Sequence, residues 1–158
     1  MTSIATTLAP TLRRAVGWLD SLQPLALLAA RLYVAQVFWL SGLTKIRDWD
    51  TTLALFENEY QVPLLSPAVA AWMGTGGELA LLVLLALGLA GRFAAAGLSV
   101  VNVVAVLSLA EIAPAALQQH VTWGVLLAGL AIHGVGRWSL DCALVAPALR
   151  PSKLGDQS

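Results

Sequence analysis

Three polar side chains stand inside stretches of sequence that are otherwise apolar, and their types could support chemistry. They are Arg31, Glu78 and Asn102, each in a different apolar stretch. A charged side chain inside a membrane is costly and usually faces the interior of a helix bundle. At about 1.5 Å of rise per residue, the three lie at comparable depths. We therefore expect one buried cluster of arginine, glutamate and asparagine.

This cluster has two interpretations. In the first it is structural, because an Arg31–Glu78 pair with an asparagine fixes the register of neighbouring helices. In the second it is functional, a polar site inside the bundle that binds a headgroup, a quinone carbonyl or a proton. The residues alone leave both interpretations open.

Further polar groups lie at the expected ends of the apolar stretches. Lys45 ends the polar stripe of the first stretch, where Glu111, His120 or other loop carboxylates could meet it. The imidazole of His120 titrates near neutral pH and could accept a proton. His133 lies ~20 Å further along the same helix, too far to share a metal ion with it. With Cys142 as the single cysteine and no haem, flavin, zinc or disulfide motif, the sequence predicts no metal site.

The elements that hold these groups follow from the composition. The chain has 158 residues, of which 58% are hydrophobic and 11% charged, and its mean hydropathy is +0.78. Soluble domains carry about 25% charged residues, so this chain cannot cover a surface with polar groups. Nine basic and nine acidic residues give a net charge of zero. These numbers exclude an ordinary soluble enzyme, a disordered protein and a nucleic-acid-binding protein, which needs a positive excess.

Four apolar stretches approach the roughly 20 residues that a membrane helix needs. We expect an all-α, four-helix transmembrane bundle with a short amphipathic helix at the interface, in the first outer loop, beginning near Asp50. Ser139 should cap another short helix that runs to about Leu149. The predicted order is a tail at 1–22, a membrane domain at 23–142 with spans at 25–43, 68–89, 93–110 and 121–135, and a second tail at 143–158.

The basic residues predict an orientation. Four spans place both termini on one side, together with most of the basic side chains. That side would hold Arg13, Arg14, Arg92, Arg137, Arg150 and Lys153, against Lys45 and Arg47 on the other. Because cytoplasmic loops carry an excess of lysine and arginine, both termini should be cytoplasmic.

Several motifs resemble those of the DoxX family of DoxX/DoxD-like inner-membrane proteins. The first span contains R-L followed by F-x-x-S-G-x-x-K, and the C-terminal part contains G-x-G-x-x-S-L-D. Their order and spacing extend over about residues 30 to 142. The matching segments are Arg31–Lys45, Phe56–Pro63, Gly77–Leu79, Gly88–Arg92, His120–Trp123 and Gly134–Asp141.

The resemblance implies a four-helix protein of the bacterial inner membrane. Members of the family are commonly classed as oxidoreductases, and the family name comes from a relationship to the membrane subunit of a thiosulfate:quinone oxidoreductase. Two of the matching positions, Arg137 and Asp141, we expect to hold the tail against the turn at 88–92. The positions carried over from the family are Arg31, Lys45, Glu78, Arg92, His120, Arg137 and Asp141.

Together these observations favour a membrane subunit of a quinone-linked redox system. Lys45 or His120 would bind a quinone oxygen, Glu78 and His120 would handle protons, and a partner protein would carry the electrons. Arg31 and Asn102 would supply further polar contacts. The quinone site would be lined by Phe38, Lys45, Trp72, Glu78 and His120.

Two alternatives remain. The protein could be a non-enzymatic membrane anchor or assembly partner for another protein, with Arg31–Glu78 as a structural lock. A transporter has less support, because the chain shows no repeat and no broken helix, although a homo-oligomer could supply a path.

Overall fold

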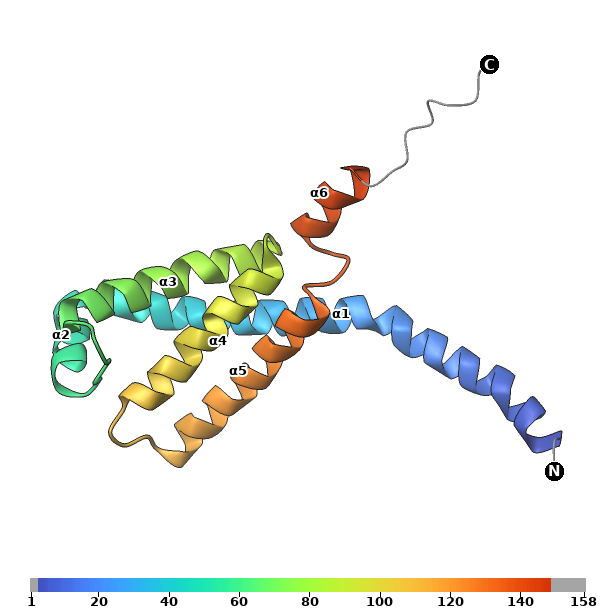
Figure 1. Cartoon of the computed structure of the whole chain (residues 1–158), viewed down its shortest axis with the longest axis horizontal. Coiled ribbons are helices and arrows are strands. Elements are labelled where there is room, and N and C mark those ends of the chain that lie inside the picture. The colour runs from blue at the N-terminus through green and yellow to red at the C-terminus, as the bar shows by residue number, and fades with distance from the viewer. Residues whose placement is uncertain (1–2, 149–158) are drawn as a thin grey trace, which may run out of the picture.

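The structure, a computed structural model, describes residues 3–148, which are almost entirely helical. Four helices close a ring in which α1 packs on α3, α3 on α4, α4 on α5, and α5 on α1. Helix α2 covers one end of this bundle, while the first part of α1 and all of α6 project from the other end (Figure 1). The helices are α1 (Ser3–Arg47), α2 (Trp49–Asn58), α3 (Pro67–Leu87), α4 (Gly91–Ser108), α5 (Pro114–His133) and α6 (Leu140–Ala148).

The two ends of the bundle differ in what connects the helices. At one, the turn end, residues 88–90 join α3 to α4 and residues 134–139 join α5 to α6. At the other, the loop end, α2 lies between α1 and α3, and residues 109–113 join α4 to α5. Backbone hydrogen bonding ties the two loop-end connections together, because the amide of Gln61 donates to the carbonyl of Ser108 over 2.8 Å.

Local sequence signals explain where the helices begin and end. Pro67 and Pro114 open α3 and α5, where a missing amide hydrogen costs nothing. Gly88 and Gly134 end the same two helices with φ of 67° and 86°, in the region that favours glycine. Ser139 precedes α6, and its hydroxyl oxygen accepts from the amide of Cys142 over 3.2 Å, which confirms the predicted cap.

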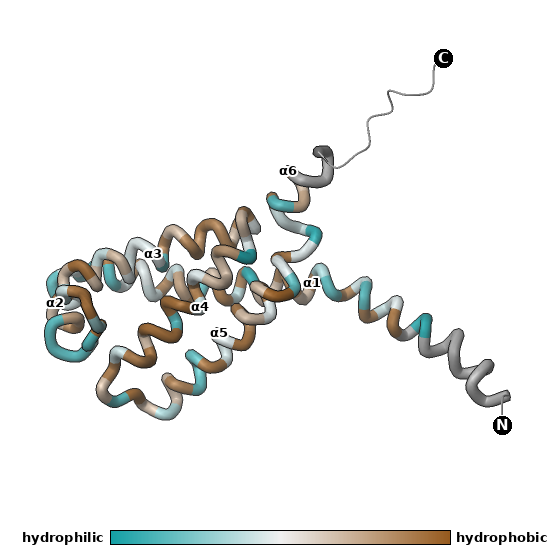
Figure 2. Tube along the Cα trace, in the orientation of Figure 1, coloured by the Kyte–Doolittle hydropathy of each residue, from teal (hydrophilic) through white to brown (hydrophobic). Residues whose placement is uncertain are grey.

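The distribution of apolar side chains is that of a membrane protein. A core of leucine, valine and phenylalanine fills the bundle, including Val34, Leu85, Leu98 and Leu127. Large apolar side chains also cover the outside of α1, α3, α4 and α5, and polar residues gather at α2 and the bundle ends (Figure 2). Among the described residues, four helices are long and apolar enough to cross a membrane.

The predicted all-α four-helix bundle is thus confirmed, with shifted boundaries. Helix α1 is continuous from Ser3, so the described part of the expected tail at 1–22 is helical, and α6 occupies 143–148 of the second tail. Residues 149–158, with the predicted helix end at Leu149, lie outside the described residues. The predicted spans at 25–43, 68–89, 93–110 and 121–135 overlap the apolar helical segments Val16–Arg47, Pro67–Leu87, Gly91–Ser108 and Pro114–His133.

The short helix in the first loop is present, and its N-cap lies two residues before the predicted start at Asp50. Asp48, rather than Asp50, caps α2, and its carboxylate accepts from the Thr51 amide over 3.0 Å and from the Thr51 hydroxyl over 2.7 Å. These hydrogen bonds lower the pKa of Asp48. The buried hydroxyl of Thr52 donates to the carbonyls of Lys45 and Asp48, which fixes α2 against the end of α1.

Candidate functional site

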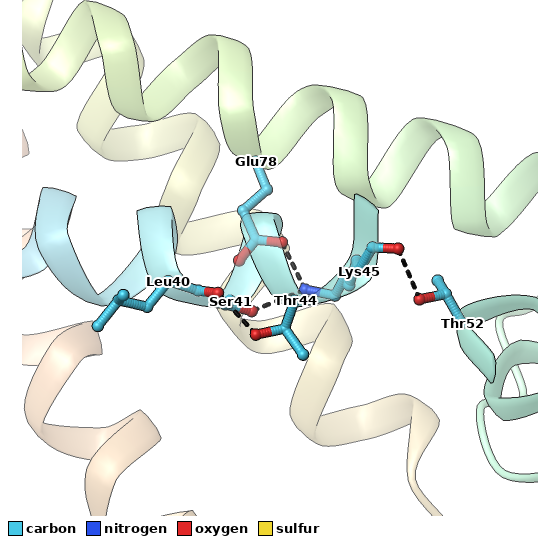
Figure 3. Close-up of polar contacts among 6 residues, drawn as sticks. All are labelled: Leu40, Ser41, Thr44, Lys45, Thr52 and Glu78. Atoms are coloured by element: carbon cyan, nitrogen blue, oxygen red, sulfur yellow. Dashed lines mark hydrogen bonds and ion pairs between the residues drawn. The ribbon is translucent and has the colours of Figure 1, made fainter. Parts of the chain in front are cut away.

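A buried ion pair joins α1 to α3 in the loop-end half of the bundle. The ammonium of Lys45 lies 2.5 Å from Oε2 of Glu78 and also donates to the hydroxyl of Ser41 over 2.7 Å (Figure 3). The Glu78 side chain is 4% exposed and that of Lys45 is 25% exposed. The Glu78 carboxylate is therefore almost fully buried, while the Lys45 ammonium is partly exposed.

The predicted cluster of Arg31, Glu78 and Asn102 is wrong. Glu78 pairs with Lys45, Asn102 bonds to His120, and Arg31 bonds to backbone carbonyls at the turn end. The reason is the direction of helical side chains, which tilt toward the N-terminus of their helix. On α1 this carries the long Arg31 side chain away from Glu78 and brings Lys45 toward it. The expected partners of Lys45 were loop carboxylates or His120, and Glu78 takes their place.

Beside the ion pair lies a pocket of about 240 Å³ between α2, α3 and α4. Lys45 and Glu78 contribute its charged wall, and the rest is mainly apolar. Met73, Val100 and Val104 line it as well and are exposed on the outer surface of the bundle, so the pocket borders the lipid-facing side. Such a site suits a flat, mostly apolar ligand that carries one or two polar atoms.

Tyr60 adds a phenol to this pocket. It lies just after α2, where it forms an isolated bridge with Leu109 and packs against Phe56 with ring centroids 4.9 Å apart. Burial, followed by the negative charges of Glu59 and Glu78, raises the pKa of Tyr60. The phenol is therefore protonated at neutral pH and can donate a hydrogen bond.

Only two of the residues predicted to line a quinone site meet at this pocket, namely Lys45 and Glu78. Trp72 is 66% exposed and packs against Trp49 with tilted rings, whose centroids are 4.3 Å apart. Phe38 is buried in the core, edge-on to Trp123. The predicted residues lie at similar depths but face different neighbouring helices. Depth along a helix does not reveal which neighbour a side chain faces.

His120 and Asn102 form a second polar pair between α4 and α5. The Asn102 amide nitrogen donates to the carbonyl of His120 over 2.9 Å, so its oxygen faces Nδ1 of the imidazole at 2.8 Å. An amide oxygen only accepts, and Nδ1 must therefore carry the proton. Trp123 packs edge-on to the same ring, and Gly124 leaves room for the Asn102 amide. Nε2 is the nitrogen left to accept a proton.

A third polar arrangement closes the turn end. The Asp141 carboxylate accepts from the amides of Ala90 and Gly91, each over 2.8 Å, and its own amide donates to Gly88 over 2.9 Å. We call these contacts the Asp141 clasp. They confirm that Asp141 holds the C-terminal segment against the turn. No described contact gives Arg137 the same role.

Arg31 supports the clasp from inside the bundle. Its guanidinium donates to the carbonyls of Val135 over 3.2 Å and Trp138 over 2.8 Å. The side chain is buried, it meets no carboxylate among the described residues, and its Nε has no partner there. Arg31 therefore positions the connection between α5 and α6 and does not reach the pocket.

Reasoning from sequence missed Ser41 and Tyr60. The motif F-x-x-S-G-x-x-K places Ser41 one helical turn before Lys45, a spacing that could have identified the pair. Tyr60 reaches the pocket only because its loop pairs with the loop before α5, and no local pattern signals that contact. Within the described residues, no three His, Cys, Asp or Glu side chains gather as a metal site would require.

The comparisons with known proteins identify the family. The model of the family described as DoxX matches residues 26–111, more than half of the chain. That match includes Arg31, Lys45, Glu78 and Asn102 but ends before His120 and Asp141. No curated protein and no solved structure matches the chain. With its four apolar helices, this chain is a membrane protein that belongs to the DoxX family.

Proposed function

We propose that this protein is the membrane subunit of a quinone-linked redox system and that the pocket beside Lys45 and Glu78 receives the quinone ring. The observation that carries the proposal is a buried ion pair on the wall of a pocket that borders the lipid-facing surface. Ionisable groups inside membrane helices generally mark substrate or proton pathways. Quinones are dissolved in the bilayer, and a laterally placed pocket can take them up directly.

The side chains have distinct tasks in this proposal. Oxidation of a quinol releases two electrons and two protons, and reduction of a quinone takes them up. The Lys45 ammonium and the Tyr60 phenol donate hydrogen bonds to ring oxygens, and the Glu78 carboxylate accepts or returns a proton. The electrons pass to or from a cofactor-bearing partner protein, because the chain has a single cysteine and no redox pair of its own.

The size of the pocket supports a ring and not a whole isoprenoid lipid. Its volume of about 240 Å³ is below the range of roughly 300–1,000 Å³ typical of sites for drug-sized ligands. The tail of a quinone would therefore lie outside, along the exposed Met73, Val100 and Val104. His120 lies on the α5 side of the bundle and would serve as a separate proton-accepting group through Nε2.

The proposed location is the bacterial inner membrane, with both termini in the cytoplasm. Arg92 and Arg137 lie at the turn end, and Arg13 and Arg14 lie on the part of α1 that projects beyond it. The loop end offers Arg47 and the already paired Lys45. An excess of basic residues on the cytoplasmic side supports this orientation. The pocket then lies in the outer half of the membrane.

The alternative function is an anchor or assembly partner without chemistry of its own. It is favoured by the projecting part of α1, which exposes Val16, Trp18, Leu19 and Leu22. In that case the Lys45–Glu78 pair is a lock between α1 and α3. A homo-oligomer or another membrane protein would then cover the apolar side chains.

Quinone binding to the purified protein in nanodiscs tests the two functions. A short-tailed ubiquinone analogue should bind the wild type, and Ala105→Phe, which fills the pocket, should weaken binding at least tenfold. Val125→Phe, on the exposed side of α5, is the matched control and should bind normally. Glu78→Gln should lower quinone-linked turnover with the partner present. Equal binding by Ala105→Phe and the wild type would exclude this pocket and favour the anchor.

A further inference from the structure

A groove lies at the turn end, far from the ion pair. It has a volume of about 810 Å³ and lies between α1, the start of α4 and the connection from α5 to α6. Its polar lining includes the basic Arg92, His133 and Arg137 and the acidic Asp20 and Asp141. Helix α3 ends, α4 begins and α5 ends at this level. In a bilayer the groove therefore lies at the depth of the lipid headgroups.

Two exposed guanidinium groups stand in this groove without partners. Neither Arg92 nor Arg137 makes a hydrogen bond or ion pair with any residue that the structure describes. The Arg92 side chain lies beside the end of α5, where a Cβ on Gly134 would lie 3.4 Å from its Nε. Its donors are available for a ligand.

Two carboxylates also line the groove, and neither forms an ion pair with Arg92 or Arg137. Both oxygens of Asp141 are taken by the amides at the start of α4, so this helix N-terminus is already occupied. Asp20 is exposed on α1 and pairs with no described residue. Behind the wall, Arg31 is buried against the Val135 and Trp138 carbonyls with no described counter-ion. Asp20 and Asp141 thus balance Arg92 and Arg137 in formal charge, and Arg31 behind the wall leaves a small positive excess.

Aromatic side chains border the groove at the same level. Phe93, in the first turn of α4, is 67% exposed, and Trp138, just after the groove wall, is 58% exposed. Aromatic residues concentrate where hydrocarbon meets headgroups. The combination of exposed aromatics with unpaired arginines in a hollow matches the interfacial zone and not a protein interior.

We propose that this groove binds the phosphate-bearing headgroup of an anionic phospholipid. Arg92 and Arg137 donate to the phosphate oxygens, since a guanidinium presents paired donors that suit phosphate. The acyl chains extend past Phe93 along the outside of the bundle. Basic hollows between membrane helices on the cytoplasmic side are typical headgroup sites. The bound lipid contacts α1, α4 and the α5–α6 connection. The Asp141 clasp holds the same connection against the start of α4.

Lipid retention measured by native mass spectrometry tests the proposal. The purified full chain is titrated with phosphatidylglycerol and, separately, with phosphatidylcholine. Each basic residue contributes about a factor of five at an anionic surface, so the double variant Arg92→Gln, Arg137→Gln should bind phosphatidylglycerol about 25-fold more weakly. The control Arg13→Gln, Arg14→Gln removes the same charge from the projecting part of α1 and should bind as the wild type does.

Three outcomes would overturn the proposal. The first is equal weakening in the double variant and its control, which would indicate a general charge effect. The second is equal affinity of the wild type for both lipids. The third is binding of inorganic phosphate alone with the same affinity as phosphatidylglycerol, which would make the ligand a soluble anion. If the double variant does not fold, Arg137→Gln alone replaces it, with an expected fivefold loss.

Discussion

Lys45 and Glu78 lie 2.5 Å apart across the interface of α1 and α3, and Ser41 takes a second hydrogen bond from the same ammonium. The carboxylate is almost fully buried, and among the described residues Lys45 is the cation that pairs with it. Removing the cation leaves an uncompensated charge, whereas removing both charges does not. This asymmetry separates the contribution of the pair to stability from its contribution to function.

Replacing Lys45 by Met should therefore lower the free energy of unfolding by about 3 kcal/mol. The double variant Lys45→Met, Glu78→Gln should recover most of that loss, because no charge remains buried. Thermal unfolding of the purified protein in detergent measures both. A double variant as unstable as the single one would show that packing of the lysine stem, and not charge, explains the loss.

Removing the Asp141 carboxylate should open the turn end. Asp141→Ala loses two hydrogen bonds to the amides of Ala90 and Gly91, and loss of such a cap typically costs about 1–2 kcal/mol. The matched control is Asp20→Ala, a carboxylate at the same end that bonds to no described residue. Hydrogen exchange at Ala90 and Gly91 should accelerate in the first variant only. Unchanged exchange would contradict the clasp.

Gly91 permits the close approach of α4 to the connection after α5. A Cβ at this position would overlap the side chain of Val135, so Gly91→Ala should destabilise the bundle by about 1–3 kcal/mol. Gly129→Ala, on α5, faces open space and should be neutral or stabilising by up to about 1 kcal/mol. Parallel thermal unfolding compares the two. Similar effects would mean that α4 and the connection are further apart than described.

The cap of α2 should respond to pH in one direction. The pKa of Asp48 is lowered in the folded chain by bonds from the Thr51 hydroxyl and amide. Its stabilisation is thus full above the unfolded pKa of about 4 and is lost as the pH falls through the lower folded value. The protection factor of the Thr51 amide should decrease over that window in the wild type and stay level in Asp48→Asn. A level wild-type profile would contradict the cap.

The imidazole of His120 should occupy one tautomer. In the wild type, nitrogen NMR shifts at a pH where the ring is neutral should show the proton on Nδ1, facing the oxygen of Asn102. Asn102→Leu removes that acceptor, and a mixture of tautomers should appear. A fixed Nδ1–H form in the variant would mean that another group orients the ring.

The sequence alone was sufficient for the class of fold and for most of the elements. Hydropathy predicted four spans. Asp50 and Ser139 indicated the two short helices. The predicted fourth span begins at residue 121, later than α5 does, because Gln118 and Gln119 suggest a loop but lie on that helix. Pro114 was the better signal for where that helix begins.

The candidate site was less accessible from the sequence. Glu78 was identified as buried and polar, but its partner depends on the direction in which long side chains lie along α1. Arg31 and Lys45 are separated by about 20 Å along that helix, and only Lys45 extends toward Glu78. Tyr60 depends on pairing between two loops. Both the Lys45–Glu78 contact and the position of Tyr60 join residues far apart in the chain, so hydrophobic periodicity does not predict them.

The Asp141 clasp also imposes an order on biosynthesis. Helices α3 and α4 are joined by residues 88–90 alone, so they enter the bilayer together as a helical hairpin. At that moment the amides of Ala90 and Gly91 have only water to bind, because Asp141 is about fifty residues from being translated. The ribosome must deliver all of α5 before the clasp can close. A chain arrested before that point would hold these two helices with the amides of Ala90 and Gly91 still unbound by Asp141, and the clasp would close only after α5 has been made.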